Sequence, residues 1–255
     1  RVIPTGIKHG TITIMIADIG YEVTTYRVDG EYDDNRHPKK VTFTNSLIED
    51  LSRRDFTINA MAYNERNGIV DYFNGLNDLN SKIVKCVGSP LCRYNEDALR
   101  MMRAIRFSSQ LGFEIENNTY DGIIDLYENL NTISKERVKD ELCKILISSH
   151  AKKGLLNLVR THLMDYIAPE IYDCVGFEQY NKHHDKNVFE HILSVVENVE
   201  PKLELRLSAL LHDIGKPKCF SIDKDNIGHF YGHAKISTDM SREILKNLKE
   251  KLGIN

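Results

Sequence analysis

NEDALRMMRAIRF, from Asn95 to Phe107, is the stretch around which this chain is organised. Its pattern predicts one helix with an apolar side and an arginine at every third position. Asp97 and Arg100 would share one face of that helix, and a carboxylate beside a guanidinium can read the edge of a nucleobase. The arginines that follow can hold a triphosphate. The alternative is a solvated helix face with one ion pair, which has little effect on stability.

Composition narrows the class of protein. The 255 residues suffice for one large domain or two to three small ones, and 41% hydrophobic with 28% charged residues is typical of a soluble globular protein. A net charge of -3 excludes a polycation, so any nucleic acid would meet a local basic surface. Five scattered cysteines, no CxxC pair and no apolar run long enough for a bilayer favour a cytoplasmic protein without a membrane partner. Because the first residue is Arg1, we expect the natural N-terminus to lie upstream.

The first part of the chain has strand patterns. Residues Thr11–Ile16 are rich in β-branched side chains, and a second strand is expected at Tyr21–Arg27 after a tight turn. Glu22 stands in that second, partly apolar strand, so it is a candidate metal-binding or hydrogen-bonding carboxylate. The alternative is a glutamate on the exposed face. Short strands are also expected at Ile69–Asp71 and Ile83–Val87.

Between these strands lie a polar loop and an arginine pair. Asp29–Lys40 is either a plain linker or a flap near a ligand. Ser46 and Glu49 have the spacing of a capping box at a helix start. In the RRDFTINAM segment at residues 53–61, we expect one or both arginines to turn inward toward a phosphate or a structural carboxylate.

After Phe107 the pattern is helical throughout. Helices are expected at Asn118–Asn129, from Ser134 as N-cap to Leu146, and at Ala151–Thr161, with further helical chain at Leu163–Ala168. The basic residues on the second of these helices fit either an RNA phosphate backbone or an ordinary solvated face. They are Lys135, Arg137, Lys139 and Lys144.

Histidines gather in the last third of the chain. His183-His184-Asp185 precedes an apolar segment with His191, an apolar helix ends in His212-Asp213, and His233 follows. These residues can converge on a divalent ion, and imidazole ligands suit transition metals. A lone histidine on an apolar helix is usually structural, but several in this order, with Gly-Lys-Pro ending the helix, favour a site.

Four segments occur in the order found in one family: TGIKHGT at 5–11, EVTTYR at 22–27, RRDFTINAM at 53–61 and EDALRMMRAIRF at 96–107. The first 150 or so residues therefore resemble the class II tRNA nucleotidyltransferases (CCA-adding enzymes) and the related bacterial poly(A) polymerases. The resemblance implies that Arg54 contacts the incoming nucleotide and that Asp97 and Arg100 read its base. Arg103 and Arg106 would add nucleotide and phosphate contacts. Glu22 would be a third carboxylate supporting the catalytic metal site, and the loop would help to switch between CTP and ATP.

One part of the family pattern is absent from the sequence. The family's catalytic centre has a glycine-rich turn and an Asp-x-Asp pair, which hold Mg²⁺ for phosphoryl transfer. We expect that segment upstream of Arg1, because Asp33-Asp34 has the wrong spacing and lies in a loop. The chain alone is therefore expected to bind nucleotide poorly and to transfer none.

The histidine-rich segment resembles the HD superfamily of metal-dependent phosphohydrolases. That resemblance implies His191, His212 and Asp213 as metal ligands with His233 as a further candidate, whereas Asp239 finds no clear place. The expected fold is α+β. Residues 1–88 would be a partial polymerase-β-like nucleotidyltransferase head, residues 89–150 a helical neck for base recognition and RNA binding, and residues 151–255 a helical body containing the HD domain.

Several functions fit these expectations. The first is addition of CCA to the 3′ end of tRNA from CTP and ATP, without a nucleic-acid template and with Mg²⁺. A poly(A) polymerase, or an enzyme that adds only CC or only A, would use the same chemistry. A metal-dependent HD phosphohydrolase with an RNA-binding head, holding a second divalent transition metal, is an alternative from another class, and an inactive RNA-binding fragment is a third.

Overall fold

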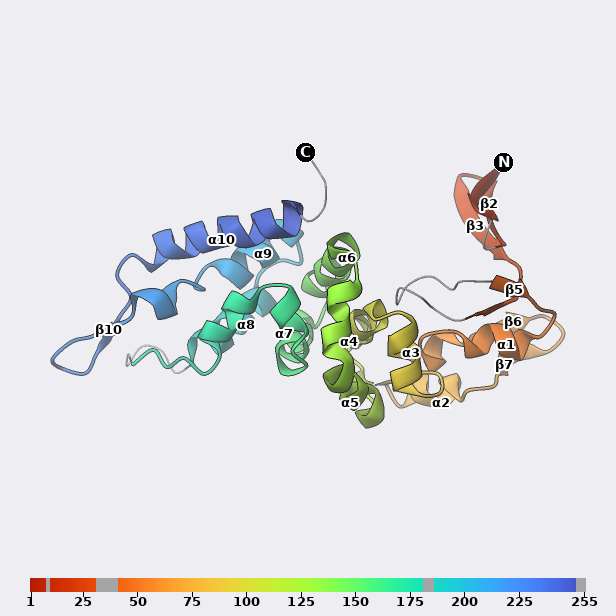
Figure 1. The fold of residues 1–255 in the computed structure, drawn as a ribbon, viewed down its shortest axis with the longest axis horizontal. Helices are drawn as coiled ribbons and strands as arrows, with labels where there is room; N and C mark the ends of the chain where they lie inside the picture. Colours follow the sequence, from red (N-terminus) through yellow and green to blue (C-terminus); the bar gives the residue numbers. More distant parts are fainter. Residues whose placement is uncertain (8–9, 31–40, 181–185, 251–255) are drawn as a thin grey trace.

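The computed structural model describes residues 1–7, 10–30, 41–180 and 186–250, and Figure 1 shows them as a ribbon. Most of the polar loop expected at Asp29–Lys40 and the whole His183-His184-Asp185 cluster lie outside these residues. Within the described chain, no helix is long and apolar enough to cross a membrane.

The N-terminal strands form a small antiparallel sheet. Its strands β1 (Val2–Gly6), β2 (Thr11–Ile16) and β3 (Ile19–Thr24) pair in sequence order. The turn between β2 and β3 has positive φ at Ala17 and Asp18, as two-residue hairpins require. The prediction for Thr11–Ile16 is confirmed, whereas the second strand ends three residues early. The chain then forms β4 (Arg27–Asp29), which pairs with β5 (Val41–Phe43).

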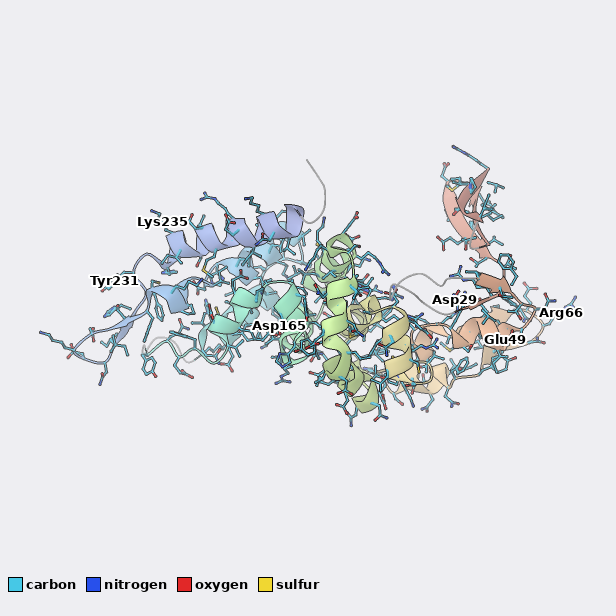
Figure 2. All side chains as sticks on the ribbon, in the orientation of Figure 1. Asp29, Glu49, Arg66, Asp165, Tyr231 and Lys235 are labelled. Atoms are coloured by element: carbon cyan, nitrogen blue, oxygen red, sulfur yellow. The ribbon has the colours of Figure 1, made fainter. Side chains whose placement is uncertain are left out.

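Short elements complete the head. They are α1 (Leu47–Ser52), η2 (Thr57–Asn59), the hairpin of β6 (Met61–Asn64) with β7 (Gly68–Asp71), and α2 (Gly75–Asn80). The Ser46 side chain accepts a hydrogen bond from the Glu49 amide at 3.4 Å, so it caps α1 as predicted. The reciprocal half of the capping box is missing, because the Glu49 carboxylate (labelled in Figure 2) instead accepts from the Thr44 hydroxyl at 2.5 Å.

The helix expected over residues 95–107 is two helices. Helix α3 (Pro90–Glu96) ends before Asp97, and α4 (Leu99–Leu111) begins after it. Asp97 has extended backbone angles, φ -145° and ψ 102°, and its side chain accepts a hydrogen bond from the Leu99 amide at 3.1 Å. A short polar side chain that bonds to nearby backbone competes with the helix in this way. The prediction of one continuous helix is therefore wrong.

The neck continues with α5 (Asn117–Leu126), η3 (Tyr127–Thr132), α6 (Lys135–Leu146) and α7 (Ala151–Arg160). A short parallel pair of β8 (Ile83–Val84) and β9 (Glu114–Ile115) joins the head to this region. The expected helix at Ala151–Thr161 is confirmed to within one residue. Ser134 stands at the N-cap of α6 as expected, although its side chain makes no capping hydrogen bond.

The described part of the body consists of helices and one small hairpin. Its elements are η4 (Leu163–Tyr166), η5 (Pro169–Cys174), α8 (Val188–Asn198), α9 (Leu203–Leu211), η6 (Lys216–Cys219), β10 (Ser221–Ile222), β11 (Gly228–His229) and α10 (His233–Glu250). Figure 1 shows β10 at the end of the molecule opposite the N-terminal sheet. Together with β9 in the neck, this hairpin is the departure from the all-helical expectation after Phe107.

One hydrophobic core connects these parts. It runs from Phe56 in the head through Met101 and Ile105 on α4 to Ile244 on α10. Arg206 on α9 is 5% exposed and donates hydrogen bonds to the carbonyl oxygens of Val199 at 3.1 Å and Leu146 at 3.2 Å. It thereby satisfies carbonyl groups at the C-terminal ends of α8 and α6, which helices leave without internal partners.

Candidate functional site

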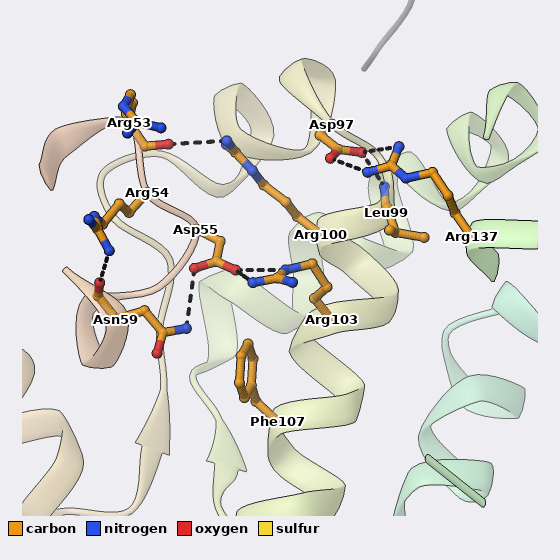
Figure 3. Close-up of a pocket in the computed structure, with 10 residues that line it drawn as sticks. All are labelled: Arg53, Arg54, Asp55, Asn59, Asp97, Leu99, Arg100, Arg103, Phe107 and Arg137. Carbon is orange, nitrogen blue, oxygen red and sulfur yellow. Dashed lines mark hydrogen bonds and ion pairs between the residues drawn. The ribbon is translucent and has the colours of Figure 1, made fainter. Parts of the chain in front are cut away.

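A polar cavity of about 620 Å³ opens between residues 53–59 of the head and the start of α4, and Figure 3 shows its lining. Five arginines and two aspartates dominate that lining, so its formal charge is positive. The lining residues are Arg53, Arg54, Asp55, Asn59, Asp97, Leu99, Arg100, Arg103, Phe107 and Arg137. A cavity of this charge suits a polyanionic ligand.

Asp55 fixes Arg103 at the cavity wall. Its Oδ2 atom accepts from Arg103 Nε at 2.8 Å and from Nη2 at 2.5 Å. Its Oδ1 atom accepts from the Phe56 amide at 2.9 Å and from the Asn59 side chain at 3.3 Å. Both carboxylate oxygens are thus committed, and the role of Asp55 is to orient the arginine.

Asp97 and Arg100 both line the cavity but do not pair with each other. The Asp97 carboxylate binds Arg137 of α6, with Oδ2 2.8 Å from Nη2. Arg100 pairs with Glu96 at 2.6 Å and donates to the Arg53 carbonyl oxygen at 3.1 Å. The expected shared helix face is therefore wrong, because the helix breaks at Asp97. Two different partners hold the acceptor and the donor on the wall of one cavity (Figure 3).

The two adjacent arginines have different surroundings. Arg53 pairs with Asp50 at 2.6 Å, which confirms the expectation that one of them meets a structural carboxylate. The Arg54 side chain is 43% exposed and makes longer contacts, 3.2 Å to the Asn59 carbonyl oxygen and 3.5 Å to Asp50. Burial opposes ionisation of Asp50, but hydrogen bonding and charge from Arg53 outweigh it and lower the pKa of this carboxyl.

Two of the predicted site residues lie outside the cavity lining. Arg106 pairs with Glu141 of α6 at 2.5 Å, with side chains 12% and 5% exposed, and its guanidinium lies 4.1 Å from the ring centre of Phe107. Glu22 is exposed on β3, opposite Thr13 of β2. Arg137 is the residue whose place in the site the sequence did not reveal, because it stands 40 positions from Asp97.

A second cluster of polar side chains lies in the body. His191 of α8 and His212 at the end of α9 have their Nε2 atoms 3.2 Å apart. These atoms lie 3.4 Å and 3.2 Å from Asp213 Oδ2, and His233 Nε2 lies 3.7 Å from Asp213 Oδ1. The structure therefore brings together the three expected metal ligands, whose possible ligand atoms lie within 4.8 Å of one another, and places the further candidate His233 beside Asp213. Asp239 is exposed on α10 and pairs with Arg242 at 3.1 Å.

Backbone carbonyls orient two of these imidazoles. His212 Nδ1 lies 2.8 Å from the Ala209 carbonyl oxygen, and His233 Nδ1 lies 2.8 Å from that of Phe230. Since a carbonyl oxygen can only accept, each Nδ1 carries a proton and each Nε2 faces Asp213, where it donates to the carboxylate when protonated and can bind a metal ion when it is not. Burial opposes ionisation of Asp213, but hydrogen bonds from His212 and Lys216 prevail and hold the pKa of its carboxyl well below the usual range. Three imidazoles and one carboxylate fit a divalent transition metal.

Comparisons with known proteins identify the domains of the chain. Three protein-family models match the chain: "Poly A polymerase head domain" at residues 1–85, "Probable RNA and SrmB-binding site of polymerase A" at 112–174, and "HD domain" at 183–254. Together they define the class, a polymerase-type nucleotidyltransferase head joined to an RNA-binding region and an HD domain.

Curated relatives are similar along most of the chain. A CCA-adding enzyme of Leuconostoc mesenteroides is 45% identical over 199 residues, which are 76% of this chain and 50% of that protein. One from Lactobacillus johnsonii is 38% identical over 244 residues, 96% of this chain and 56% of that protein. The chain thus spans about half the length of the curated relatives it matches. It belongs to the class II CCA-adding enzyme and poly(A) polymerase family.

Solved structures show the same fold. The Bacillus stearothermophilus CCA-adding enzyme in complex with CTP superposes with a TM-score of 0.60 at 26% identity, covering 99% of this chain and 68% of that chain. The Thermotoga maritima CCA-adding enzyme complexed with tRNA gives 0.59 at 19% identity, covering 98% of this chain and 54% of that chain. The second likeness concerns the fold alone.

Proposed function

We propose that the protein to which this chain belongs adds CCA to tRNA 3′ ends from CTP and ATP. The observation that carries this proposal is the arginine-rich cavity, in which Asp97 and Arg100 present an acceptor and a donor on one wall. Polar groups held in this way can discriminate bases by hydrogen bonding without a template strand. The CCA-adding relatives, and the solved CCA-adding enzyme in complex with CTP, support the same conclusion.

Each cavity residue has a distinct proposed role. Asp97, braced by Arg137, accepts a hydrogen bond from the exocyclic amino group of cytosine or adenine, and Arg100, braced by Glu96, donates to a ring acceptor. Arg54 and Arg103 bind phosphate oxygens. Arg106 supports these contacts by holding α6 against α4 rather than by touching the nucleotide.

The transfer reaction needs groups beyond this cavity. The RNA 3′-hydroxyl attacks the α-phosphorus, a phosphoester bond forms, and pyrophosphate leaves. Mg²⁺ would lower the pKa of the attacking hydroxyl and neutralise charge on the phosphate. We assign its principal ligands to an Asp-x-Asp pair outside this chain, with Glu22 as a supporting carboxylate.

We also propose a cytoplasmic location for the protein, because its five free cysteines fit a reducing compartment.

The direct test uses the complete gene product. It is incubated with tRNA lacking CCA, with CTP, ATP and Mg²⁺, and the product is sized at single-nucleotide resolution. We expect extension that stops as CCA, and no extension by the isolated chain. A long adenosine ladder would instead identify a poly(A) polymerase, a stop after CC or A a partial enzyme, and no extension would refute nucleotide transfer.

A second function rests on the HD cluster. The carbonyl contacts of His212 and His233 aim ring nitrogens at Asp213, as in metal-binding histidines. We propose that His191, His212, Asp213 and His233 hold a transition metal for phosphoester hydrolysis. The test is hydrolysis of a 2′,3′-cyclic nucleotide, in which water opens the ring to a nucleoside monophosphate; a chelator and His212→Ala should each block it. Hydrolysis that survives both changes would contradict this assignment.

A further inference from the structure

A buried lysine lies directly beside the HD cluster. Lys216 Nζ is 2.8 Å from Asp213 Oδ2, 2.8 Å from Gln179 Oε1, and 5.3 Å from the ring centre of Phe230. Lys216 is 6% exposed and Gln179 is 1% exposed. A buried ammonium needs such partners, because an unpaired charge in the protein interior is strongly destabilising. The position of the Lys216 ammonium therefore depends on Asp213, Gln179 and Phe230. Of these three residues, Gln179 is the one that precedes α8 in the chain.

The Gln179 side chain has only one workable orientation. Its Nε2 donates to the Lys186 carbonyl oxygen at 2.9 Å, and its Oε1 accepts from Lys216. An ammonium group can only donate and a carbonyl oxygen can only accept, so the reversed amide would face both partners with the wrong group. Gln179 thus ties Lys216 to the chain just before α8, the helix that carries His191.

The backbone around Gln179 is equally fixed. The Gly228 amide of β11 donates to the Tyr180 carbonyl oxygen at 2.8 Å. A Cβ atom at Gly228 would lie 2.3 Å from the Gln179 carbonyl oxygen, so only glycine fits there. Residues 179–180 are therefore packed against β11, and the side chain of Gln179 has a rigid base.

This arrangement changes the charge that the cluster offers to a metal. The Lys216 ammonium offsets the Asp213 carboxylate, so the other donors among the described residues of the cluster are imidazole nitrogens of its histidines. Mg²⁺ prefers oxygen ligands, whereas imidazole nitrogen suits Co²⁺, Ni²⁺ and Zn²⁺. The site therefore offers little to Mg²⁺ as long as the lysine stays on Asp213.

We propose that Gln179 is a positioning residue that holds Lys216 on Asp213 and thereby makes the HD site select a transition metal over Mg²⁺. This inference rests on the proposed metal site. When Gln179 is lost, Lys216 can move away from an arriving cation, and the freed carboxylate favours Mg²⁺ most. The selectivity of the site, and not merely its occupancy, then depends on a residue that touches no metal.

The experiment measures dissociation constants of Co²⁺ and Mg²⁺ for the chain by calorimetry, with the Co²⁺ absorption spectrum as a second readout. We expect Gln179→Leu and Gln179→Met to reduce the ratio of Co²⁺ to Mg²⁺ affinity about tenfold, and Lys216→Met to reduce it further. Gln110→Leu is the matched control, because Gln110 Oε1 accepts from Arg106 at 3.2 Å far from the cluster. Its ratio should equal that of the wild type.

The outcomes separate the two proposals. If the wild type binds no Co²⁺, the metal site itself is refuted. If it binds Co²⁺ but both Gln179 variants keep the wild-type ratio, the metal site stands and the positioning role is overturned. Gln179→Met keeps the length of the side chain and removes both hydrogen bonds, so it still tests the proposal if circular dichroism shows that the leucine variant fails to fold.

Discussion

Arg137 and Asp97, 40 positions apart, form a two-pronged ion pair across the interruption between α3 and α4. The guanidinium lies 2.8 Å from Oδ2 and 3.4 Å from Oδ1 of the carboxylate. The Leu99 amide adds a third hydrogen bond to the same group. Asp97 is therefore held from two sides. The orientation of its carboxylate oxygens is set by Arg137 of α6 as well as by the start of α4.

Replacing Arg137 should loosen base selection. In the complete gene product, we expect Arg137→Gln to reduce discrimination of CTP over UTP about tenfold, because Asp97 loses its charged partner and becomes free to rotate. The measurement is the ratio of kcat/KM values for the two nucleotides. Arg242→Gln, which removes an exposed pair with Asp239, is the control. Unchanged discrimination in a folded Arg137→Gln variant would show that Asp97 needs no brace.

Arg106 should contribute mainly to the stability of the fold, and Arg54 mainly to nucleotide binding. Arg106→Gln leaves the buried Glu141 carboxylate with only Lys144 at 3.0 Å, so we expect unfolding free energy to fall by about 3 kcal/mol. Arg54→Gln, at an exposed position, should change it by less than about 1 kcal/mol but weaken CTP binding. Urea unfolding and nucleotide titration of the complete gene product measure both quantities. A folded Arg106→Gln variant that lost CTP binding outright would place Arg106 on the nucleotide.

Acid should act on the head through Asp50. The pKa of this carboxyl is lowered in the folded protein, so the folded state binds fewer protons than the unfolded state near the unfolded pKa of about 4. The stability it contributes is fully present above that pH and is lost as pH falls through the folded pKa. We expect Asp50→Asn to be less stable than wild type at pH 7 and the difference to shrink below about pH 4. Urea unfolding across this range checks the slope, and a difference that grew on acidification would contradict the sign.

Metal should stabilise the body. A ligand that binds only the folded state raises its stability, by about 2.7 kcal/mol at a hundred times the dissociation constant. Saturating Co²⁺ should therefore raise the Tm, EDTA should reverse the effect, and His212→Ala should abolish it. His162→Asn serves as the control, because His162 lies at φ 61°, where asparagine is tolerated. An equal Co²⁺ shift in His212→Ala would mean that the ion binds elsewhere.

Local pattern predicted much of the fold and less of the site. The strand at Thr11–Ile16 and the helix from Ala151 follow from residue type and periodicity, and the approach of His191 to His212 follows from motif order. The helix break at Asp97 was not predicted, because it depends on the Asp97 side chain accepting a hydrogen bond from the Leu99 amide at the start of α4. At 3.6 residues per turn, positions 100, 103 and 106 rotate through roughly 120°, so the last arginine leaves the face of the first.

Contacts between distant segments were beyond the sequence pattern. Nothing local distinguishes Arg137 from the other basic residues of α6, yet it alone among them lines the cavity. The same holds for Gln179, which stands between an apolar segment and a polar one. Its proposed role depends on a hydrogen bond from Lys216, which lies 37 positions later in the sequence. Such residues acquire their roles from packing, which a single sequence does not encode at short range.

The unbroken core from Phe56 to Ile244, fastened by Arg206, makes neck and body one cooperative unit in unfolding. Severing the chain between α6 and α7 would expose apolar surface on both pieces and strand a buried guanidinium. Heat or denaturant should therefore unfold the arginine-lined cavity wall and the histidine cluster in a single transition. The two candidate sites should therefore be lost at the same temperature or denaturant concentration, although their proposed chemistries differ.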